Sequence, residues 1–290
     1  MPDTLTLEAP RHALDAVTHA DPYPFYARLT AEREAAVLAA GLGGSVGPQE
    51  ALTRFIEALP AHVLAALLGF GDGARDEVAR LVGEAARAVF PGGSPEQVER
   101  GKDALAHLLA IAGEHVGAGP GASMAALANT IGFLLQAHDA TAALIGLTLL
   151  TLARRPDLLA RIEASPDALP AFVDEVVRFD APVQNTRRFA AEPVVIGDAP
   201  LESGDAVLVL LAAANRDPAA NPDPQRFDPE RSDARVFTFG IGPHACPGRA
   251  LATAITCAGV RRLLASGIDP RRLDRNPRYH ASPNCRRPIL

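Results

Sequence analysis

The amino-acid sequence predicts a mainly α-helical protein with small β-sheets. Residues 21–153 are rich in Ala and Leu and follow a helical pattern. Helix ends are expected where Pro and Gly gather, at Pro60, 69–73, 91–94 and 117–121. After Pro182 the pattern changes to short β-like runs at 193–196 and 206–211, separated by turn residues. Helices therefore dominate the first half of the chain, and small sheets follow.

The remaining elements can be placed in chain order. Pro170 suits the first position of a helix that we expect to end at Phe179. Residues 214–231 are dense in Pro, Asn and Asp, which predicts an irregular segment ordered by packing. A glycine-rich loop and a final helix follow. Since no linker-like break divides the chain, we expect an N-terminal tail at 1–20 and a single domain at 21–290.

Composition excludes several classes of protein. The 290 residues carry a net charge of −6 without a basic tract, so nucleic acid is not an expected partner. Three cysteines, an odd number without paired-ligand spacing, argue against a disulfide framework and favour the cytoplasm. The N-terminus lacks the pattern of a secretory signal or anchor. The apolar stretch 131–153 contains Gln136, His138 and Asp139, so we expect a buried core helix and no membrane contact.

One cysteine lies in a glycine-rich loop that leads into a helix. Pro247 suits the first helical position, which places Cys246 at or beside a helix N-terminus. Backbone N–H groups and the helix dipole there favour a thiolate. A thiolate that ligates haem iron pushes electron density onto the metal and favours O–O cleavage. The alternative is a buried structural cysteine, which is the commoner role of an isolated cysteine.

The spacing Phe239-x-x-Gly242-x-His244-x-Cys246-x-Gly248 resembles the cysteine-ligand signature of the cytochrome P450 family in its bacterial soluble form. The resemblance implies haem b as cofactor, with iron held by Cys246 and Phe239 packed beside the sulfur. It also implies that Gly242 and Gly248 allow close approach to the macrocycle and that His244 meets a haem propionate. The competing hypothesis is that His244 and Cys246 supply two of the ligands of a zinc site, but no second Cys or His pair lies at ligand spacing nearby.

Other segments agree with this family. Glu175 and Arg178 are three residues apart and share a helix face, and Arg231 lies downstream. Together they resemble the Glu-Arg-Arg network that locks the segment before the family's cysteine loop; a chance surface pair is the alternative. Arg188 stands where the family usually has an arginine that reaches a haem propionate. The adjacent Arg187 competes for that role, and a solvated charge at a strand start is the alternative for both.

The central helix resembles the family's distal helix, in which an acid and then an alcohol guide protons to iron-bound dioxygen. Asp139 is the acid, and the alternative for it is a solvated or paired helix carboxylate. Ala140 replaces the alcohol. Thr141 is one residue further, and a one-residue step turns a side chain by about 100°, so we expect it to point elsewhere. Either a water or Gln136 substitutes, or the chemistry differs. His138 is expected in a packed or polar contact.

The front half is shorter than the resemblance implies for the family. Residues 21–29 look like the family's opening helix, and 51–71 look like a segment normally found much later. We therefore expect a cytochrome P450-like fold lacking much of the first sheet and the early helices, including the substrate-contacting loop and the proximal helix. Their loss would open the haem pocket on both sides, and a homodimer or another protein would cover the gap.

Three functions fit these residues. The first is a haem-thiolate monooxygenase that oxidises a small organic substrate with dioxygen and electrons from a ferredoxin-type donor. The second is a haem-thiolate enzyme that uses peroxide or needs no reductant, which tolerates Ala140 better. The third is a catalytically inert P450-like partner protein, favoured by the shortened front half. The intact cysteine signature favours an enzyme.

Overall fold

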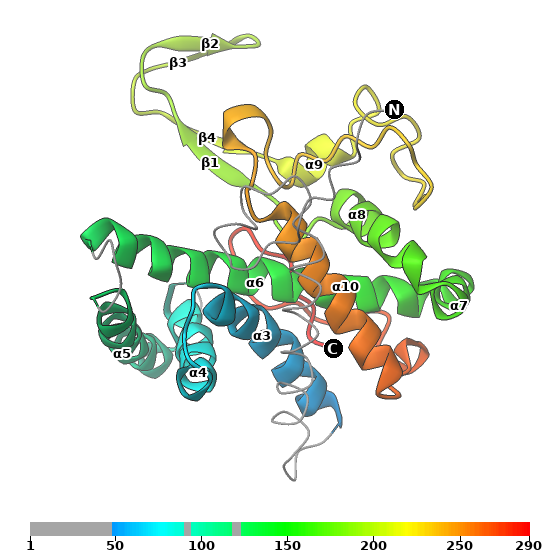
Figure 1. Ribbon diagram of the computed structural model, residues 1–290. Helices are drawn as coiled ribbons and strands as arrows, with labels where there is room; N and C mark the ends of the chain where they lie inside the picture. The colour runs from blue at the N-terminus through cyan, green and yellow to red at the C-terminus, as the bar shows by residue number, and fades with distance from the viewer. Residues whose placement is uncertain (1–47, 90–93, 118–122) are drawn as a thin grey trace, which may run out of the picture.

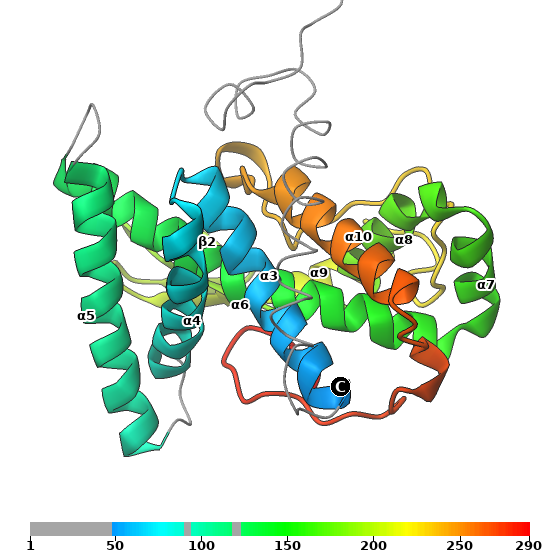
Figure 2. The same ribbon diagram turned by 60° about the horizontal axis from the view of Figure 1, so that its bottom comes forward.

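A long central helix organises the molecule, and the other helices pack around it (Figures 1 and 2). The structure is a computed structural model that describes residues 48–89, 94–117 and 123–290. Its longer helices are α3 (Pro48–Leu67), α4 (Asp72–Val89), α5 (Pro95–Gly117), α6 (Met124–Arg154), α7 (Pro156–Ala164), α8 (Leu169–Phe179) and α10 (Arg249–Ala265). A short helix α9 (Leu211–Asn215) and three 3-10 turns, Pro166–Ala168, Gly242–His244 and Pro270–Arg272, complete the helical elements of the described residues.

Helix α6 is the axis of the core. It begins at a Ser123 cap, whose Oγ accepts the backbone N–H of Ala126 at 3.1 Å. Its second half is buried almost without interruption from Thr141 to Ala153. By length and composition α6 could cross a membrane, but 67% of that apolar window is buried inside the protein. Such burial is typical of a core helix, as the polar interruptions in the sequence predicted.

Two small antiparallel sheets extend from the helical body. Strands β1 (Thr186–Phe189) and β4 (Ala206–Val209) pair with Arg188 opposite Val207. Strands β2 (Val194–Ile196) and β3 (Ala199–Leu201) form a hairpin that projects away from the helices (Figure 1). The mainly helical fold with small sheets is therefore confirmed, and both β-like runs of the sequence form strands.

Within residues 48–179 the predicted helix ends agree with the structure except at Pro60. Helices α3 and α5 end at Leu67 and Gly117, at or just before predicted breaks, and α8 spans Leu169–Phe179 as expected. Pro60, however, lies inside α3, so the predicted break there was wrong. The residues on both sides of Pro60, Leu59 and Ala61, are fully buried. Core packing therefore offsets the backbone hydrogen bond that proline removes. The expected opening helix at 21–29 and the tail at 1–20 lie outside the described residues.

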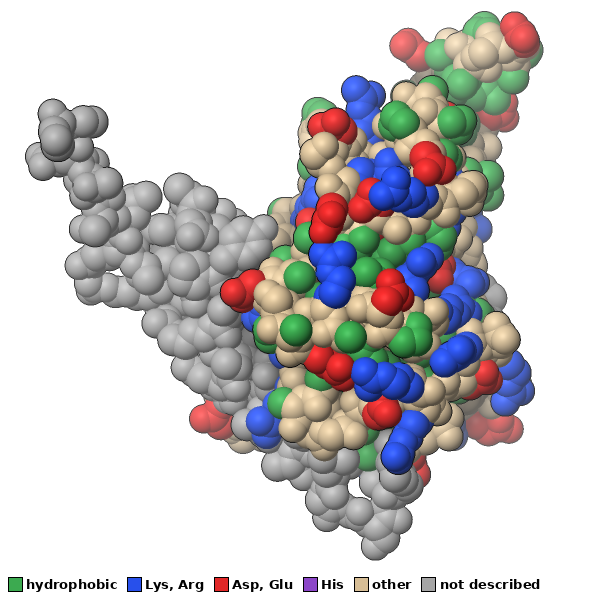
Figure 3. Space-filling model, turned by 90° about the vertical axis from the view of Figure 1, so that its right-hand side faces the viewer, with side chains coloured by type: hydrophobic (Ala, Val, Ile, Leu, Met, Phe, Trp, Pro, Cys, Tyr) green, Lys and Arg blue, Asp and Glu red, His purple; other side chains and the backbone are tan. Residues whose placement is uncertain are grey.

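Charge is mixed over the side of the molecule that carries α7. Arginine side chains alternate there with Asp and Glu (Figure 3). Among the exposed ion pairs of the described residues, Arg161 lies 2.6 Å from Glu230, and Arg271 lies 2.9 Å from Glu163. Such exposed pairs each contribute about 0–1 kcal/mol, so they matter more for solubility than for stability.

Candidate functional site: the cysteine loop and the central helix

The loop before α10 takes its shape from glycines. Gly240 has φ +69°, and a Cβ there would overlap the carbonyl oxygen of His244. Gly242 has φ +59° and opens a 3-10 turn that ends at His244. The backbone N–H of Cys246 donates to the carbonyl of Phe239 at 2.6 Å and closes the loop. Glycine is therefore required at position 240, because an L side chain disfavours this φ and the space is filled.

Cys246 lies at the start of α10 but one turn before the first helical residue. The helix begins at Arg249 with Gly248 as its cap, so the prediction that Pro247 is the first helical position was wrong. Pro247 and Gly248 form a turn instead, in which the Arg249 N–H points to the Cys246 carbonyl at 3.4 Å. The Cys246 side chain is free and exposed. The alternative of a buried structural cysteine therefore does not hold.

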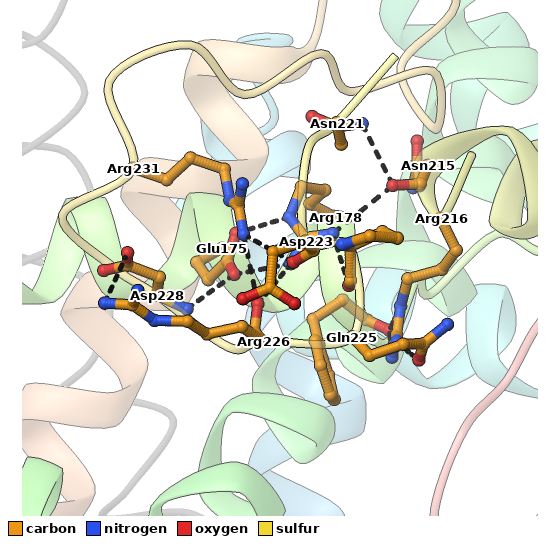
Figure 4. A network of polar contacts seen from close by, with 12 residues as sticks. Glu175, Arg178, Asn215, Arg216, Asn221, Asp223, Gln225, Arg226, Asp228 and Arg231 are labelled. Carbon is orange, nitrogen blue, oxygen red and sulfur yellow. Dashed lines mark hydrogen bonds and ion pairs between the residues drawn. The ribbon is translucent and has the colours of Figure 1, made fainter. Parts of the chain in front are cut away.

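A buried ion pair on α8 holds the irregular segment that precedes the cysteine loop. Arg178 is 0% exposed, and its Nε and Nη2 atoms each donate to a carboxylate oxygen of Glu175 at 2.7 Å (Figure 4). The same guanidinium donates to three backbone carbonyls of the irregular segment, those of Asn215 at 3.3 Å, Pro224 at 3.0 Å and Arg226 at 3.0 Å. Glu175 also accepts the Asp228 N–H at 2.7 Å. The pair thus fixes residues 215–228 on α8.

Arg231 joins this network through the backbone. Its guanidinium donates to the carbonyls of Pro222 at 2.6 Å, Asp223 at 3.0 Å and Arg226 at 3.3 Å. The Arg226 carbonyl is therefore shared with Arg178, which also donates to it (Figure 4). The three residues predicted as a network do converge, because the Arg226 carbonyl accepts hydrogen bonds from both Arg178 and Arg231.

Two buried asparagines that the sequence analysis did not single out complete the scaffold. The Asn215 amide accepts the Phe237 N–H at 2.7 Å and donates to Thr238 Oγ1 at 2.7 Å. The Asn221 amide accepts the Arg235 N–H at 2.8 Å and donates to the Arg235 carbonyl at 2.9 Å. Both asparagines are 0% exposed, and their hydrogen bonds hold residues 235–238, which lead into the cysteine loop. The only sequence signal was the high Asn content of 214–231.

Asp139 on α6 is a paired carboxylate. His138 Nδ1 lies 3.0 Å from Asp139 Oδ1, and Arg287 Nη1 lies 3.6 Å from the same oxygen. Burial pushes the pKa of Asp139 up, but the hydrogen bond and charge of His138, with the charges of Arg287 and His280, outweigh it and leave that pKa below its usual value. His138 is 3% exposed, in the packed and polar contact that the sequence predicted.

Ala140 and Thr141 point in different directions, as predicted. Thr141 is 3% exposed and belongs to the buried side of α6, whereas Ala140 is half-buried. Phe133 and Gln136 are exposed, and Ala137 and Ala140 are half-buried. These four residues form the more open strip of α6.

The two side chains predicted to meet a haem carboxylate, those of Arg188 and His244, are both exposed. Arg188 lies on β1, where its Nη1 donates to Thr186 Oγ1 at 3.1 Å and to the Arg187 carbonyl at 2.8 Å. His244 ends the 3-10 turn of the cysteine loop. Arg187 and Arg188 are neighbours on one strand, so their side chains leave opposite faces of the β1–β4 pair. The two arginines therefore cannot share one role.

The other two cysteines are inert. Cys257 is buried in the core on α10, and burial raises the pKa of its thiol to about 12. Burial likewise raises the pKa of Cys285 to about 12, and its Sγ lies 3.6 Å from the Asp139 carbonyl. Of the three thiols, Cys246 alone is exposed.

The residues around Cys246 fit a haem. The exposed thiol offers the soft donor that haem iron accepts, and a Cβ at Gly242 would meet nothing within 4 Å, so that side of the loop is open. Ile241 is 63% exposed beside it, an apolar side chain that a flat apolar group would cover. Exposed His244 and Arg188 are suited to carboxylates. The cysteine loop therefore combines an exposed thiol with an exposed apolar side chain and an imidazole.

Solved structures share the fold of this chain. The structure of P450 RauA, with a biosynthetic intermediate of aurachin RE, matches with a TM-score of 0.76 at 22% identity, over 95% of this chain and 71% of that one. Cytochrome P450 CYP109Q5 from Chondromyces apiculatus matches with a TM-score of 0.77 at 22% identity, over 99% of this chain and 80% of that one. At these identities the likeness defines the fold, which is that of the P450 structures.

Sequence comparison gives the family. The family described as Cytochrome P450 matches residues 94–265. The 6-deoxyerythronolide B hydroxylase of Saccharopolyspora erythraea is 35% identical over 250 residues, which are 78% of this chain and 61% of the relative. Cytochrome P450 107B1 of the same organism is 34% identical over 73% of this chain and 56% of its own length. The chain belongs to the cytochrome P450 family. It spans about three fifths of the length of these two curated relatives.

Proposed function

We propose that this protein is a haem-thiolate monooxygenase in which Cys246 holds the iron of haem b. The observation that carries the proposal is the exposed Cys246 thiol in a loop whose shape depends on Gly240 and whose support is the buried Glu175–Arg178 pair. A rigid support suits a metal ligand because it fixes the donor atom before the metal binds. Relatives named as hydroxylases and monooxygenases support the reaction class.

The chain's own residues take defined roles in this proposal. When bound, the haem supplies redox chemistry toward dioxygen, and Cys246 supplies the electron-donating ligand. Phe239 would pack beside the sulfur when the haem is bound, and His244 and Arg188 would meet the haem carboxylates. Asp139 holds a proton-accepting carboxylate on α6, next to the open strip at Ala140. The substrate is a small organic molecule, and a ferredoxin-type protein is the proposed electron donor.

A reduced carbon monoxide spectrum tests the proposal. Thiolate-ligated haem gives a strongly red-shifted absorption band, and we expect this band from the purified full chain. Cys246→Ala should lose the band, whereas Cys257→Ala, a change in a buried core thiol, should keep it. Absence of bound haem from the wild-type protein would reject an enzyme of this kind and favour the inert partner protein.

Ala140 favours a second candidate, a haem-thiolate enzyme that uses peroxide or needs no external reductant. The alcohol expected after the acid is missing, and Thr141 points into the buried side of α6. Turnover of the same test substrate with peroxide, and with dioxygen plus a ferredoxin and its reductase, separates the two. Ala140→Thr should raise the yield of product per dioxygen consumed if the protein is a monooxygenase. Unchanged yield, together with efficient peroxide turnover, would support the second candidate.

Organisation and surroundings complete the proposal. We propose one haem domain at 21–290, located in the cytoplasm, in keeping with the bacterial P450 relatives and the buried α6. A homodimer or another protein is proposed to cover the open side of the site. Neither nucleic acid nor a membrane is a proposed partner, because the net charge is −6 and the apolar helix belongs to the core.

A further inference from the structure

The C-terminal segment contacts the part of α6 that carries Asp139. Arg287 Nη1 lies 3.6 Å from Asp139 Oδ1, and Cys285 Sγ lies 3.6 Å from the Asp139 carbonyl. About two helical turns further along α6, a Cβ added to Gly146 would lie 3.0 Å from Pro288 Cγ. The segment runs beside α6 in Figure 2. A stretch almost 150 residues distant in sequence therefore forms the immediate surroundings of Asp139.

Charged groups of alternating sign lead from the surface to Asp139. Arg87 on α4 lies 3.2 Å from Glu57 on α3, and Glu57 accepts a hydrogen bond of 2.9 Å from Arg287. Arg287 then faces Asp139, which His138 contacts at 3.0 Å. Side-chain exposure falls from 52% at Arg87 to 19% at Glu57, 13% at Arg287 and 15% at Asp139. A carboxylate this far from water needs such partners to stay charged.

The groups that face Asp139 come from several elements. They are His138 on its own helix, Arg287, His280 and Cys285 on the C-terminal segment, Glu57 on α3 and, through Glu57, Arg87 on α4. Burial lowers the pKa of His280, and the charge of Arg287 lowers it further. Arg287 is the permanent cation nearest Asp139 among them, because a guanidinium does not lose its proton in proteins.

We propose that Arg287 is a positioning residue for Asp139. Held by Glu57, it keeps the Asp139 carboxylate ionised and turned toward the C-terminal segment. Since Arg287 cannot release a proton, it sets the charge and direction of Asp139 and takes no part in proton transfer itself. The relevance to catalysis rests on the proposed function, in which Asp139 handles protons, whereas the ion pair itself needs no haem.

The test is the titration of the Asp139 carboxyl carbon by NMR in the full chain labelled with carbon-13 aspartate. The Asp139→Asn variant assigns the signal. In the wild type, the carboxyl should titrate below the ordinary Asp midpoint of about 3.9. Arg287→Gln should move the midpoint to higher pH, and Arg287→Lys, which keeps the charge, should return it toward the wild type. A wild-type midpoint at or above the ordinary value would overturn the proposal even if Arg287→Gln fails to fold.

The matched control is the neighbouring Arg286. It belongs to the same segment but pairs with Asp180 at 2.7 Å and with the Tyr279 hydroxyl at 2.8 Å. Arg286→Gln should loosen the segment and leave the Asp139 midpoint unchanged. An equal shift in both variants would show a general structural effect and reject the positioning role. Because the titration needs no haem, it is decided independently of the carbon monoxide spectrum.

A pH series of unfolding measurements gives a second readout. The folded pKa of Asp139 is depressed, so its contribution to stability is present above the unfolded pKa and is lost as pH falls through the folded pKa. The stability difference between wild type and Arg287→Gln should therefore be larger at pH 7 than below about pH 4. In a cycle with Asp139→Asn, the two losses should be less than additive at pH 7. Additive losses at every pH would contradict the proposal.

Discussion

At the scale of single residues, the scaffold of the cysteine loop depends most on Arg178. Its buried guanidinium serves Glu175 and three backbone carbonyls at once. Arg178→Met would leave a buried carboxylate and these carbonyls without a donor, so we expect a loss of about 3–5 kcal/mol in the free energy of unfolding. Denaturant titration measures it. Arg161→Gln, which removes an exposed pair with Glu230, should change stability by about 0.5 kcal/mol or less. Similar losses in both variants would show that the buried network is not the support we describe.

Thiol chemistry distinguishes the three cysteines. With a pKa of about 12, Cys257 and Cys285 hold roughly one thiolate in ten thousand at pH 8, and both are shielded by the protein. In haem-free protein, iodoacetamide at pH 8 should therefore modify Cys246 and leave the other two unmodified, as peptide mass spectrometry would show. Saturation with haem should protect Cys246. If Cys246 reacts equally fast with and without haem, it is not the ligand.

Residue contacts could be predicted where they are local. Glu175 and Arg178 are three residues apart on one helix, and the glycines and Cys246 lie within one loop, so spacing alone indicated their arrangement. The Arg287 contact with Asp139 was not predictable, because it joins residues that only the path of the C-terminal segment brings together. The asparagine contacts of the scaffold depend in the same way on how the irregular segment folds back.

At the scale of elements, close packing of α4 on α5 depends on Gly101. A Cβ at this position would overlap the Ala88 side chain and come within 2.9 Å of the Glu84 carbonyl. Gly101→Ala should therefore destabilise the protein by about 1–3 kcal/mol despite the better helix propensity of alanine. Gly113 lies on the same helix with nothing within 4 Å of an added Cβ, so Gly113→Ala should stabilise by up to about 1 kcal/mol. Thermal unfolding of both variants tests this, and a stabilised Gly101→Ala would contradict the packing.

Element boundaries show where local rules fail. Pro60 is a strong helix breaker by local propensity, but the fully buried residues beside it keep α3 continuous. Pro247 is a good first helical residue, but the turn that presents Cys246 extends to Gly248 and delays the helix to Arg249. In both cases tertiary packing or the shape of the site overrides a local preference. The break at 69–73 was predictable because Gly69 adopts a φ of +88°, which glycine allows and which ends a helix.

At the scale of the whole molecule, the exposed apolar side chains of the β1–β4 pair predict association. The Phe189 and Leu208 side chains are 68% and 53% exposed. Leu208 is paired with Arg187, and Phe189 is two residues after Arg187 on β1, so all three side chains lie on the same face of the two-stranded sheet. We expect a second copy of the chain to cover this exposed apolar face. Sedimentation equilibrium should then give twice 30.4 kDa, and the double variant Phe189→Lys, Leu208→Lys should shift the protein toward the single chain. Leu109→Lys, at an isolated exposed leucine on α5, is the control and should leave the mass unchanged. A wild-type protein that sediments as a single chain at every concentration would reject self-association and leave a different protein as the proposed cover.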